Sequence, residues 1–326
     1  MTAVDMQKVE RLFAELRVIQ DEFNKTFGVS DIYTNSRVFE ILIANYFDHV
    51  LIPAVAGGRD AKDKYGNEYE YKHYKESSTN HTWTFNDFSD STIRNLKSTK
   101  AVIFAHINDN LMPPVFDWYY YIEGQIISEF LAIRTKAIQN KRKMINVSPH
   151  QLERFLSVPK SLVKSIAKGK YDKFIIRIFE VITELKKELG VSDLDILTSN
   201  KLWEVLIAIN LGHTVLTNKS EFDAIDADGN KYEYKVSKAH SWAFEDITPE
   251  VLSKFTRIKS VFLATINKQN MEITELWEAD PIRIKELLEA KLNKKRISHE
   301  NKGGLRRLQV SIGIKDLKAI GARQLL

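Results

Sequence analysis

The same spacing of two acids and a lysine occurs twice in this chain. The stretches DAKDKYGNEYEYK, residues 60–72, and DAIDADGNKYEYK, residues 223–235, are identical at nine of thirteen positions. Each stretch begins with an aspartate that lies ten residues before a glutamate, and a lysine stands two residues after that glutamate. The two sets are Asp60, Glu70 and Lys72 in the first stretch, and Asp223, Glu233 and Lys235 in the second.

These residue types suit the hydrolysis of phosphodiesters with a divalent metal ion. Carboxylate oxygens are the ligands that Mg²⁺ prefers, and bound Mg²⁺ polarises phosphate and lowers the pKa of an attacking water. A neighbouring ammonium stabilises the charge that develops on the phosphate. The spacing therefore predicts two Mg²⁺ sites, each with the aspartate and the glutamate as metal ligands and with all three side chains catalytic. A structural charge network is the alternative.

The face on which each aspartate lies depends on a turn. Glycine and asparagine occur together in the middle of each stretch, so each is expected to form a β-hairpin. Residues two apart in a strand share a face, which places Glu70 beside Lys72. A three-residue loop at 65–67 puts Asp60 opposite Lys72 on that face, whereas a two-residue loop sends it to the other face. We expect the first arrangement, or a bulge with the same result.

A further acid lies inside each of two apolar runs, VFEILIA and LWEVLIA, which are expected to be helical. These acids are Glu40 and Glu204. Because an unpaired buried carboxylate is costly, each must have a partner. That partner is either the metal ion or a basic side chain such as the motif lysine, and the sequence leaves both open.

The hairpins belong to a longer internal repeat. FGVSDIYTNSRVFEILIANYFDHV, residues 27–50, aligns with LGVSDLDILTSNKLWEVLIAINLGHTV, residues 189–215. Further segments recur in the same order: HTWTFNDFS with HSWAFEDIT, KSTKAVIFAHINDN with IKSVFLATINKQN, and INVSPHQLERF with LQVSIGIKDLKAI. We therefore expect a first nuclease-like repeat over residues 1–157, a Lys-rich linker over 158–170, and a second repeat over 171–326.

Each repeat is expected to be a mixed α/β unit. The apolar periodicity predicts a first helix over about residues 8–27. A second helix is expected to begin near Asn35 or Ser36, which are good capping residues. AVIFAHI and SVFLATI are short apolar runs with β-branched residues, as in buried strands. Strands interleaved with helices indicate a layered α/β or α+β structure.

At these residues the chain resembles the PD-(D/E)xK nucleases, which share the restriction-endonuclease-like fold. The resemblance covers the helix, hairpin and strand core of each repeat. It implies a mixed central sheet flanked by helices, Mg²⁺ as the cofactor, and cleavage of DNA to leave 5′-phosphate ends. Carried over residue by residue, it gives the family's metal-binding aspartate as Asp60 and Asp223, its second carboxylate as Glu70 and Glu233, its lysine as Lys72 and Lys235, and the helical glutamate of some members as Glu40 and Glu204. Arg59 and Phe222 stand where many members have a proline.

The duplication fits the two strands of duplex DNA, because many restriction enzymes cut both strands as symmetric dimers with one site per subunit. We expect a type II site-specific deoxyribonuclease that is a monomeric, single-chain pseudo-dimer, with double-stranded DNA as its partner and a cognate DNA methyltransferase beside it. The alternatives are a structure-specific or repair nuclease of the same fold, a chain in which one half cuts while the other binds, and a DNA-binding module with inactive sites.

Composition agrees with a polyanionic partner. The chain of 326 residues carries a net charge of +5, and lysine and arginine gather at residues 134–143, 159–170 and 291–307. It has no cysteine, which excludes disulfides and thiolate metal sites. With no apolar run of about 18 residues and no signal pattern at its N-terminus, it is expected to be cytoplasmic, with no membrane partner.

Further DNA contacts are predicted around the two motifs. A lysine follows each motif lysine by three residues with serines close by, and these groups are candidates for the phosphate next to the cut. Asparagines after the AVIFAHI and SVFLATI runs are candidates for base edges. The predicted DNA-binding set is Lys75, Lys238, Ser78, Ser237, Asn108 and Asn267.

Overall fold

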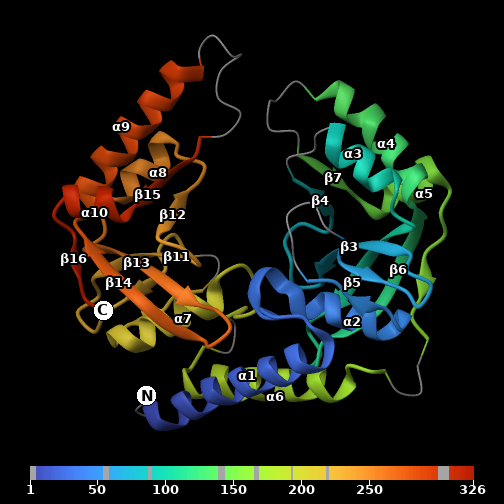
Figure 1. Cartoon of the computed structure of the whole chain (residues 1–326), viewed down its shortest axis with the longest axis horizontal. Helices are drawn as coiled ribbons and strands as arrows, with labels where there is room; N and C mark the ends of the chain where they lie inside the picture. The colour runs from blue at the N-terminus through green and yellow to red at the C-terminus, as the bar shows by residue number, and fades with distance from the viewer. Residues whose placement is uncertain are drawn as a thin grey trace. The chain divides into compact units, whose positions relative to one another are not determined.

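The computed structural model describes residues 5–53, 59–86, 90–138, 144–164, 169–191, 194–217, 220–299 and 308–326. Within them the chain is a mixed α/β structure with two similar six-stranded mixed sheets, each containing one parallel pair and flanked by helices (Figure 1). This confirms the expected fold class at the level of the sheets and their flanking helices. None of the helices in these ranges combines the length and the apolar character that crossing a membrane would require.

The first sheet is built from the first repeat. Its strands and those of a small neighbouring sheet are β1 Val50–Leu51, β2 Ala61–Lys62, β3 Glu68–Lys75, β4 Trp83–Phe85, β5 Ala101–Asn108, β6 Val115–Glu123, β7 Ile145–Val147 and β8 Ser161–Leu162. The strand order is β1-β2-β3-β5-β6-β8, with β3 and β5 parallel and the other neighbours antiparallel. β4 and β7 pair separately. β5 is buried along nearly its whole length, as the apolar run predicted for a central strand.

The second sheet repeats this arrangement. The strands are β9 Thr214–Val215, β10 Ala224–Ile225, β11 Lys231–Ser237, β12 Ser241–Phe244, β13 Ser260–Asn267, β14 Glu272–Ala279, β15 Val310–Gly313 and β16 Arg323–Gln324. The order is β16-β14-β13-β11-β10-β9, again with one parallel pair, β11 with β13, and β12 pairs separately with β15. The strands that carry the motif residues, β3 and β11, are therefore interior strands next to the central strand of each sheet.

The helices of the described residues cover these sheets. They are α1 Met6–Phe27, α2 Arg37–Phe47, α3 Asp90–Lys97, α4 Gly124–Ala137, α5 Pro149–Leu156, α6 Asp172–Glu188, α7 Lys201–Leu211, α8 Pro249–Lys254, α9 Pro281–His299 and α10 Ile314–Ala319, with a short 3-10 turn at Thr34–Ser36. The two helices predicted for the first repeat are confirmed as α1 and α2. The equivalent helices α2 and α7 contact the motif strands β3 and β11.

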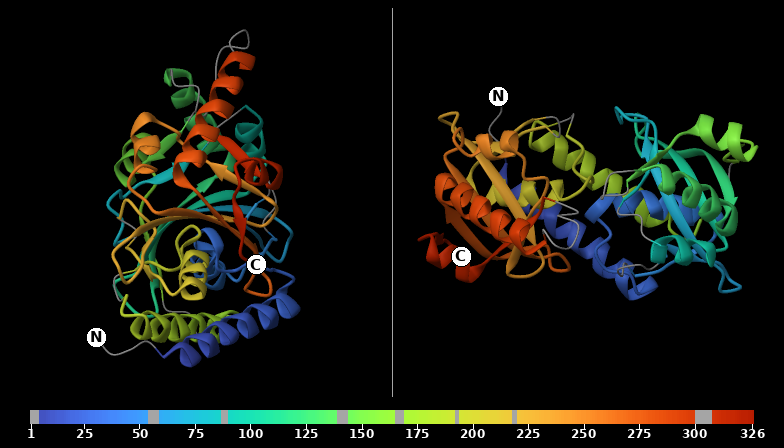
Figure 2. Two further views of the ribbon diagram at one scale, coloured as in Figure 1. Left: turned by 90° about the vertical axis from the view of Figure 1, so that its left-hand side faces the viewer. Right: turned by 90° about the horizontal axis from the view of Figure 1, so that it is seen from above.

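The chain divides into two compact units by spatial contacts. One holds residues 1–17, 33–35 and 184–326, and the other holds residues 18–32 and 36–183. Each unit keeps the sheet of one repeat. The helices α1 and α6, which lie side by side in Figures 1 and 2, are each divided between the units. The expected linker at 158–170 contains β8, so part of it belongs to the first sheet.

Two equivalent tryptophans hold the short strands β4 and β12 against the central strands. Trp83 and Trp242 are fully buried. Their indole N–H groups donate to the carbonyls of Ala105 in β5 and Ala264 in β13, each at 2.9 Å. The phenylalanines two residues later, at positions 85 and 244, lie beside the motif lysines as a result.

Candidate active sites

Each motif hairpin carries an extra residue at its aspartate. In the first hairpin Ala61 faces Tyr69. The N–H of Asp60 also donates to the carbonyl of Tyr69, at 3.0 Å, so two consecutive residues of one strand face a single residue of the other. That is the arrangement of a β-bulge, which bends a strand and redirects a side chain. The side chain of Asp60 is held there by the N–H of Tyr71, which donates to Oδ2 at 2.6 Å.

The turn differs from the one that the sequence favoured. Asp63 donates its N–H to the carbonyl of Asn67, which makes the loop residues 64–66. The predicted loop, residues 65–67, is therefore wrong by one residue. The pairing of the two strands differs by two residues from the predicted one, which had Asp60 opposite Lys72. The bulge, which was the second expected arrangement, is the one that occurs. In this arrangement Asp60 lies close enough to Glu70 and Lys72 for both charges to act on its pKa.

The second hairpin has the same geometry. Ala224 faces Tyr232, and the N–H of Asp223 donates to the carbonyl of Tyr232 at 3.1 Å. The N–H of Tyr234 donates to Oδ2 of Asp223 at 2.7 Å. Both copies of the motif therefore present the aspartate through the same bulge and the same backbone hydrogen bond.

The motif glutamate and lysine form an ion pair in each half. Lys72 Nζ lies 2.7 Å from Oε1 of Glu70, and Lys235 Nζ lies 2.7 Å from Oε1 of Glu233. Each ammonium also lies 5.4 Å from the centroid of the phenylalanine ring on β4 or β12. Although burial opposes a charged lysine, the neighbouring carboxylates raise the pKa of Lys72 and Lys235 above the ordinary value. Both side chains are therefore ammonium ions at neutral pH.

The second oxygen of each motif glutamate meets another cation. Arg59 Nη1 lies 3.1 Å from Oε2 of Glu70. Lys254 Nζ, at the end of α8, lies 2.5 Å from Oε2 of Glu233. This oxygen of Glu233 is buried, and the charge of Lys254 lowers the pKa of the carboxyl group. Neither cation was among the sequence-predicted site residues.

The helical acids Glu40 and Glu204 are paired within their own helices. Arg37 and Lys201, three residues earlier on α2 and α7, form ion pairs with them. Arg37 Nη1 also lies 3.7 Å from Oδ1 of Asp60. Both helical glutamates therefore form a salt bridge, which was one of the two alternatives. The partner is a basic residue one helical turn earlier, and not the motif lysine. A metal role for the two glutamates remains a prediction.

The carboxylates of each site repel one another. Burial, and then the charge of Glu70, raise the pKa of Asp60 to about 6. Burial, then the charges of Glu233 and Glu204, raise the pKa of Asp223 to about 7. Burial and the charge of Asp60 raise the pKa of Glu40 to about 8.

The motif glutamates behave in the opposite way. Burial raises the pKa of Glu70, but Lys72 and Arg59 together outweigh it and bring the pKa below its ordinary value. Burial likewise raises the pKa of Glu233, and Lys235 and Lys254 outweigh it. Each site thus contains a charged glutamate beside an aspartate whose charge is disfavoured.

This donor set fits Mg²⁺ through two carboxylates in each half. No group of three or more His, Asp or Glu side chains is arranged to hold a metal ion in the part of the chain that the structure describes. In each half, however, the aspartate and the glutamate are close enough for charge repulsion to raise the pKa of the aspartate. A divalent cation between them would relieve that repulsion, and carboxylate oxygens are its preferred ligands.

The raised aspartate pKa values predict that the metal-free protein loses stability as the pH rises. The folded-state pKa of Asp60, about 6, and of Asp223, about 7, exceed the ordinary value of 3.8, so the folded chain keeps protons that the unfolded chain has released. Their contribution to the free energy of unfolding is full below about pH 4 and is lost as the pH rises through 6 and 7. Thermal unfolding gives the free energy of unfolding of the protein and of the Asp60→Asn, Asp223→Asn double variant. The value for the protein minus the value for the variant should fall as the pH rises. If the free energy of unfolding of the protein rises with pH relative to that of the variant, the prediction is wrong.

The predicted DNA-binding residues lie in turns and strand ends. Lys75 is buried, with its Nζ 5.4 Å from the ring centroid of Phe39, whereas Lys238 is exposed. The N–H of Ser78 donates to the carbonyl of Lys75, and Oγ of Ser237 donates to a carbonyl four residues later.

The side-chain oxygens of Asn108 and Asn267 accept backbone N–H groups in the turns that follow β5 and β13. These contacts give both asparagines a role in shaping the turns. Of the basic runs, residues 139–143, 165–168 and 300–307 lie outside the described part of the chain. DNA contact by any of these groups remains a prediction.

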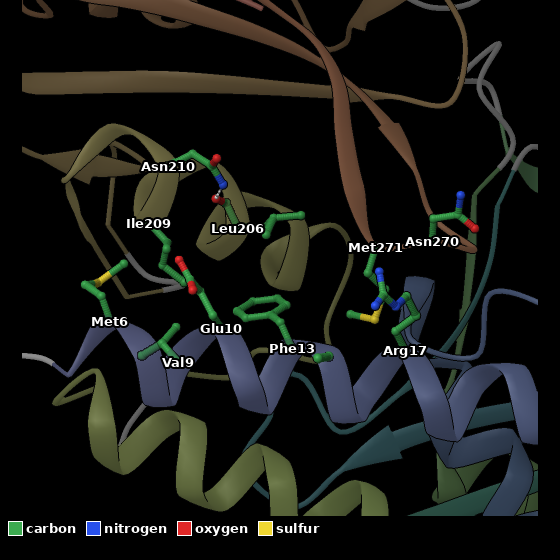
Figure 3. Close-up of a pocket in the computed structure, with 11 residues that line it drawn as sticks. Met6, Val9, Glu10, Phe13, Arg17, Leu206, Ile209, Asn210, Asn270 and Met271 are labelled. Carbon is green, nitrogen blue, oxygen red and sulfur yellow. Dashed lines mark hydrogen bonds between the residues drawn. The ribbon is translucent and has the colours of Figure 1, made fainter.

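A cavity of about 560 Å³ lies away from the motif residues (Figure 3). It is enclosed by the first half of α1, by α7 and by the turn before β14. Its lining mixes apolar side chains with the polar groups of Glu10, Arg17, Asn210 and Asn270, and none of the six motif residues contributes to it. One of its polar groups, the side-chain amide of Asn210, donates to the carbonyl of Leu206.

The residues that sequence reasoning missed are the cations. Arg37 and Lys201 had a detectable signal, because the repeat aligns them and both lie three residues before the helical glutamate. Arg59 was noted only as the residue that replaces a proline. Lys254 gave no signal, because its contact with Glu233 joins α8 to a strand that lies about twenty residues earlier in the chain.

The chain was also compared with known proteins. A scan against protein-family models and a search of the curated proteins found no match.

Proposed function

We propose that the chain is a Mg²⁺-dependent endonuclease that cuts both strands of duplex DNA at a specific sequence, with one active site in each repeat and 5′-phosphate ends. The observation that carries the proposal is the cluster of aspartate, glutamate and lysine that recurs in both halves. In both halves the motif aspartate lies near a glutamate and an ammonium, with a bulge at its own position and the same backbone hydrogen bond to its carboxylate. A charge network that served only stability would not need two carboxylates that repel each other, whereas a divalent cation would be held by both.

The residues of each half have distinct roles in this proposal. Asp60 and Glu70 in the first site, and their counterparts Asp223 and Glu233 in the second, would hold the metal ion. Bound Mg²⁺ supplies a polarised phosphate and a water of lowered pKa. The N–H of Tyr71 donates to Oδ2 of Asp60, and Oδ1 lies 3.7 Å from Nη1 of Arg37.

The role proposed for the motif lysines is that of positive charges. Because their pKa values are raised, Lys72 and Lys235 keep their protons at neutral pH. A permanent ammonium next to the metal-binding glutamate is placed to stabilise the negative charge that develops on the phosphate during hydrolysis.

The test is digestion of a long DNA of known sequence. The purified chain with Mg²⁺ is expected to give discrete fragments, whose ends are ligatable and carry 5′-phosphates, and EDTA is expected to stop the reaction. Fragments that arise only from branched or nicked DNA would favour the structure-specific nuclease. Binding to DNA with no cleavage under Mg²⁺ or Mn²⁺ would leave a DNA-binding module and overturn the proposal.

A further inference from the structure

The two candidate sites contain the same number of acidic and basic side chains. The first holds three carboxylates, at positions 40, 60 and 70, and three cations, at positions 37, 59 and 72. The second holds three carboxylates, at positions 204, 223 and 233, and three cations, at positions 201, 235 and 254. Five of the six positions are equivalent in the repeat. The third cation is the exception.

That third cation comes from different elements in the two halves. Arg59 precedes the aspartate of the first motif, and Phe222 occupies its equivalent position in the second. Lys254 ends α8 in the second half, and its equivalent in the first half is Asn95 of α3. The second assignment needs no gap, because residues 83–102 and 242–261 align one to one between the buried tryptophan and the paired residue of the central strand.

Each half therefore has a cation at one of these two positions and an uncharged residue at the other, so both sites keep a third cation. Both cations reach the same atom, Oε2 of the motif glutamate, at 3.1 Å from Arg59 and 2.5 Å from Lys254. Duplication alone cannot produce this result, because the two residues are not copies of each other. The requirement for a positive charge beside that oxygen has therefore been met twice, from different elements.

A cation in this place affects metal binding. When the glutamate turns to a divalent ion, the arginine or lysine loses its partner. The side chains of Arg59 and Lys254 are only 10% and 18% exposed, and a largely buried cation without a partner is costly. An anion that enters with the metal removes that cost. In the proposed reaction this anion is the phosphodiester.

We propose that Arg59 and Lys254 are equivalent phosphate-binding residues that couple metal binding to phosphate binding, each in its own site. The proposal rests on the proposed function for the identity of the anion. It predicts that the metal ion binds weakly alone and more tightly with a phosphodiester, and that this cooperativity depends on the third cation. Coupling between two ligands of one site is reciprocal and typically amounts to about 5- to 150-fold in affinity.

The experiment uses the repeat's own residues as substitutions. In an Asp223→Asn background, which leaves the first site intact, Mn²⁺ binding is measured by calorimetry and by the EPR signal of free Mn²⁺. Each titration is done with and without dimethyl phosphate. We expect Arg59→Phe to bind Mn²⁺ alone about tenfold more tightly than its parent, and to lose the tightening by dimethyl phosphate. The Arg59→Phe, Asn95→Lys variant, which transplants the arrangement of the second site, is expected to restore both properties.

The outcomes separate this inference from the proposed function. If Arg59→Phe binds Mn²⁺ with the same affinity as its parent, and dimethyl phosphate tightens that binding to the same extent, the inference is wrong even if the chain cuts DNA. Cooperativity that follows the third cation, in a chain that cuts no DNA, would leave the inference standing and overturn only the nuclease. If Arg59→Phe does not fold, Lys254→Asn in an Asp60→Asn background applies the same test to the second site.

Discussion

Alanine at both Lys72 and Lys235 is expected to slow the cutting of each DNA strand by roughly 100- to 1000-fold, the usual cost of losing one preorganised charged donor. Each ammonium lies 2.7 Å from a glutamate proposed to bind metal, in a buried position where a charge acts strongly. The substitution removes the charge that would stabilise the transition state. DNA binding should change little, because a surface of many phosphate contacts supplies most of the affinity for DNA. Cleavage rates on plasmid and binding by fluorescence anisotropy measure the two effects.

The control for this variant changes two lysines of the same hairpins. Lys62 on β2 and Lys231 on β11 are exposed and form no ion pair with the motif glutamates. Their replacement by alanine removes the same charge from the chain and should leave cleavage near that of the parent. Equal cleavage by the motif variant and this control would show that the motif lysines have no catalytic role.

If both proposed sites cut, a single substitution in one aspartate is expected to make the chain a nickase. Asp60→Asn removes one proposed metal ligand from the first site only, and Asp223→Asn does so for the second. With two independent sites, each variant should cut one strand at its normal rate and slow the other by at least about a hundredfold. Nicked plasmid would then accumulate before any linear form. Strand-specific end labelling should show that the two variants nick opposite strands.

The matched control makes the same change in the turns of the same hairpins. Asp63 and Asp226 hold their turns, since each accepts N–H groups from residues two and four positions later. Asp63→Asn and Asp226→Asn are expected to lower the melting temperature and to keep double-strand cutting. If Asp60→Asn or Asp223→Asn keeps full double-strand cutting, that half does not cut, and the chain has a single active site.

Local sequence patterns predicted the elements that carry the motif. The helical periodicity of α1, the apolar runs of β5 and β13, and the glycine-containing turns are signals within about twenty residues of one another. Because the sequence repeats, the pattern of each of these elements could be compared between the two halves. Other elements were not predicted, notably β6, α4, β14 and α9. The strand β6 contains a run of aromatic residues with exposed positions among them, so it shows neither a clear alternation nor a continuous apolar run.

The sequence also did not predict where the chain divides into its two units. The repeat places all of α1 in the first half, yet residues 1–17 group with the second sheet. In that unit Lys8 pairs with Glu184 and Glu188 of α6. Which helix half packs on which sheet depends on contacts between residues far apart in the chain, and such contacts leave no periodicity in the sequence.

The sequence by itself determined that the chain is a duplicated α/β protein with an acid–acid–lysine motif on a hairpin in each half. These properties depend on residue type, spacing and turn chemistry, which are local. The tertiary structure decided the rest: the bulge at Asp60 and Asp223, the bases that pair with the helical glutamates, and the exchange of Arg59 for Lys254. The physical reason is that a buried charge must be neutralised by whatever side chain the fold brings near it, and that side chain need not be close in sequence.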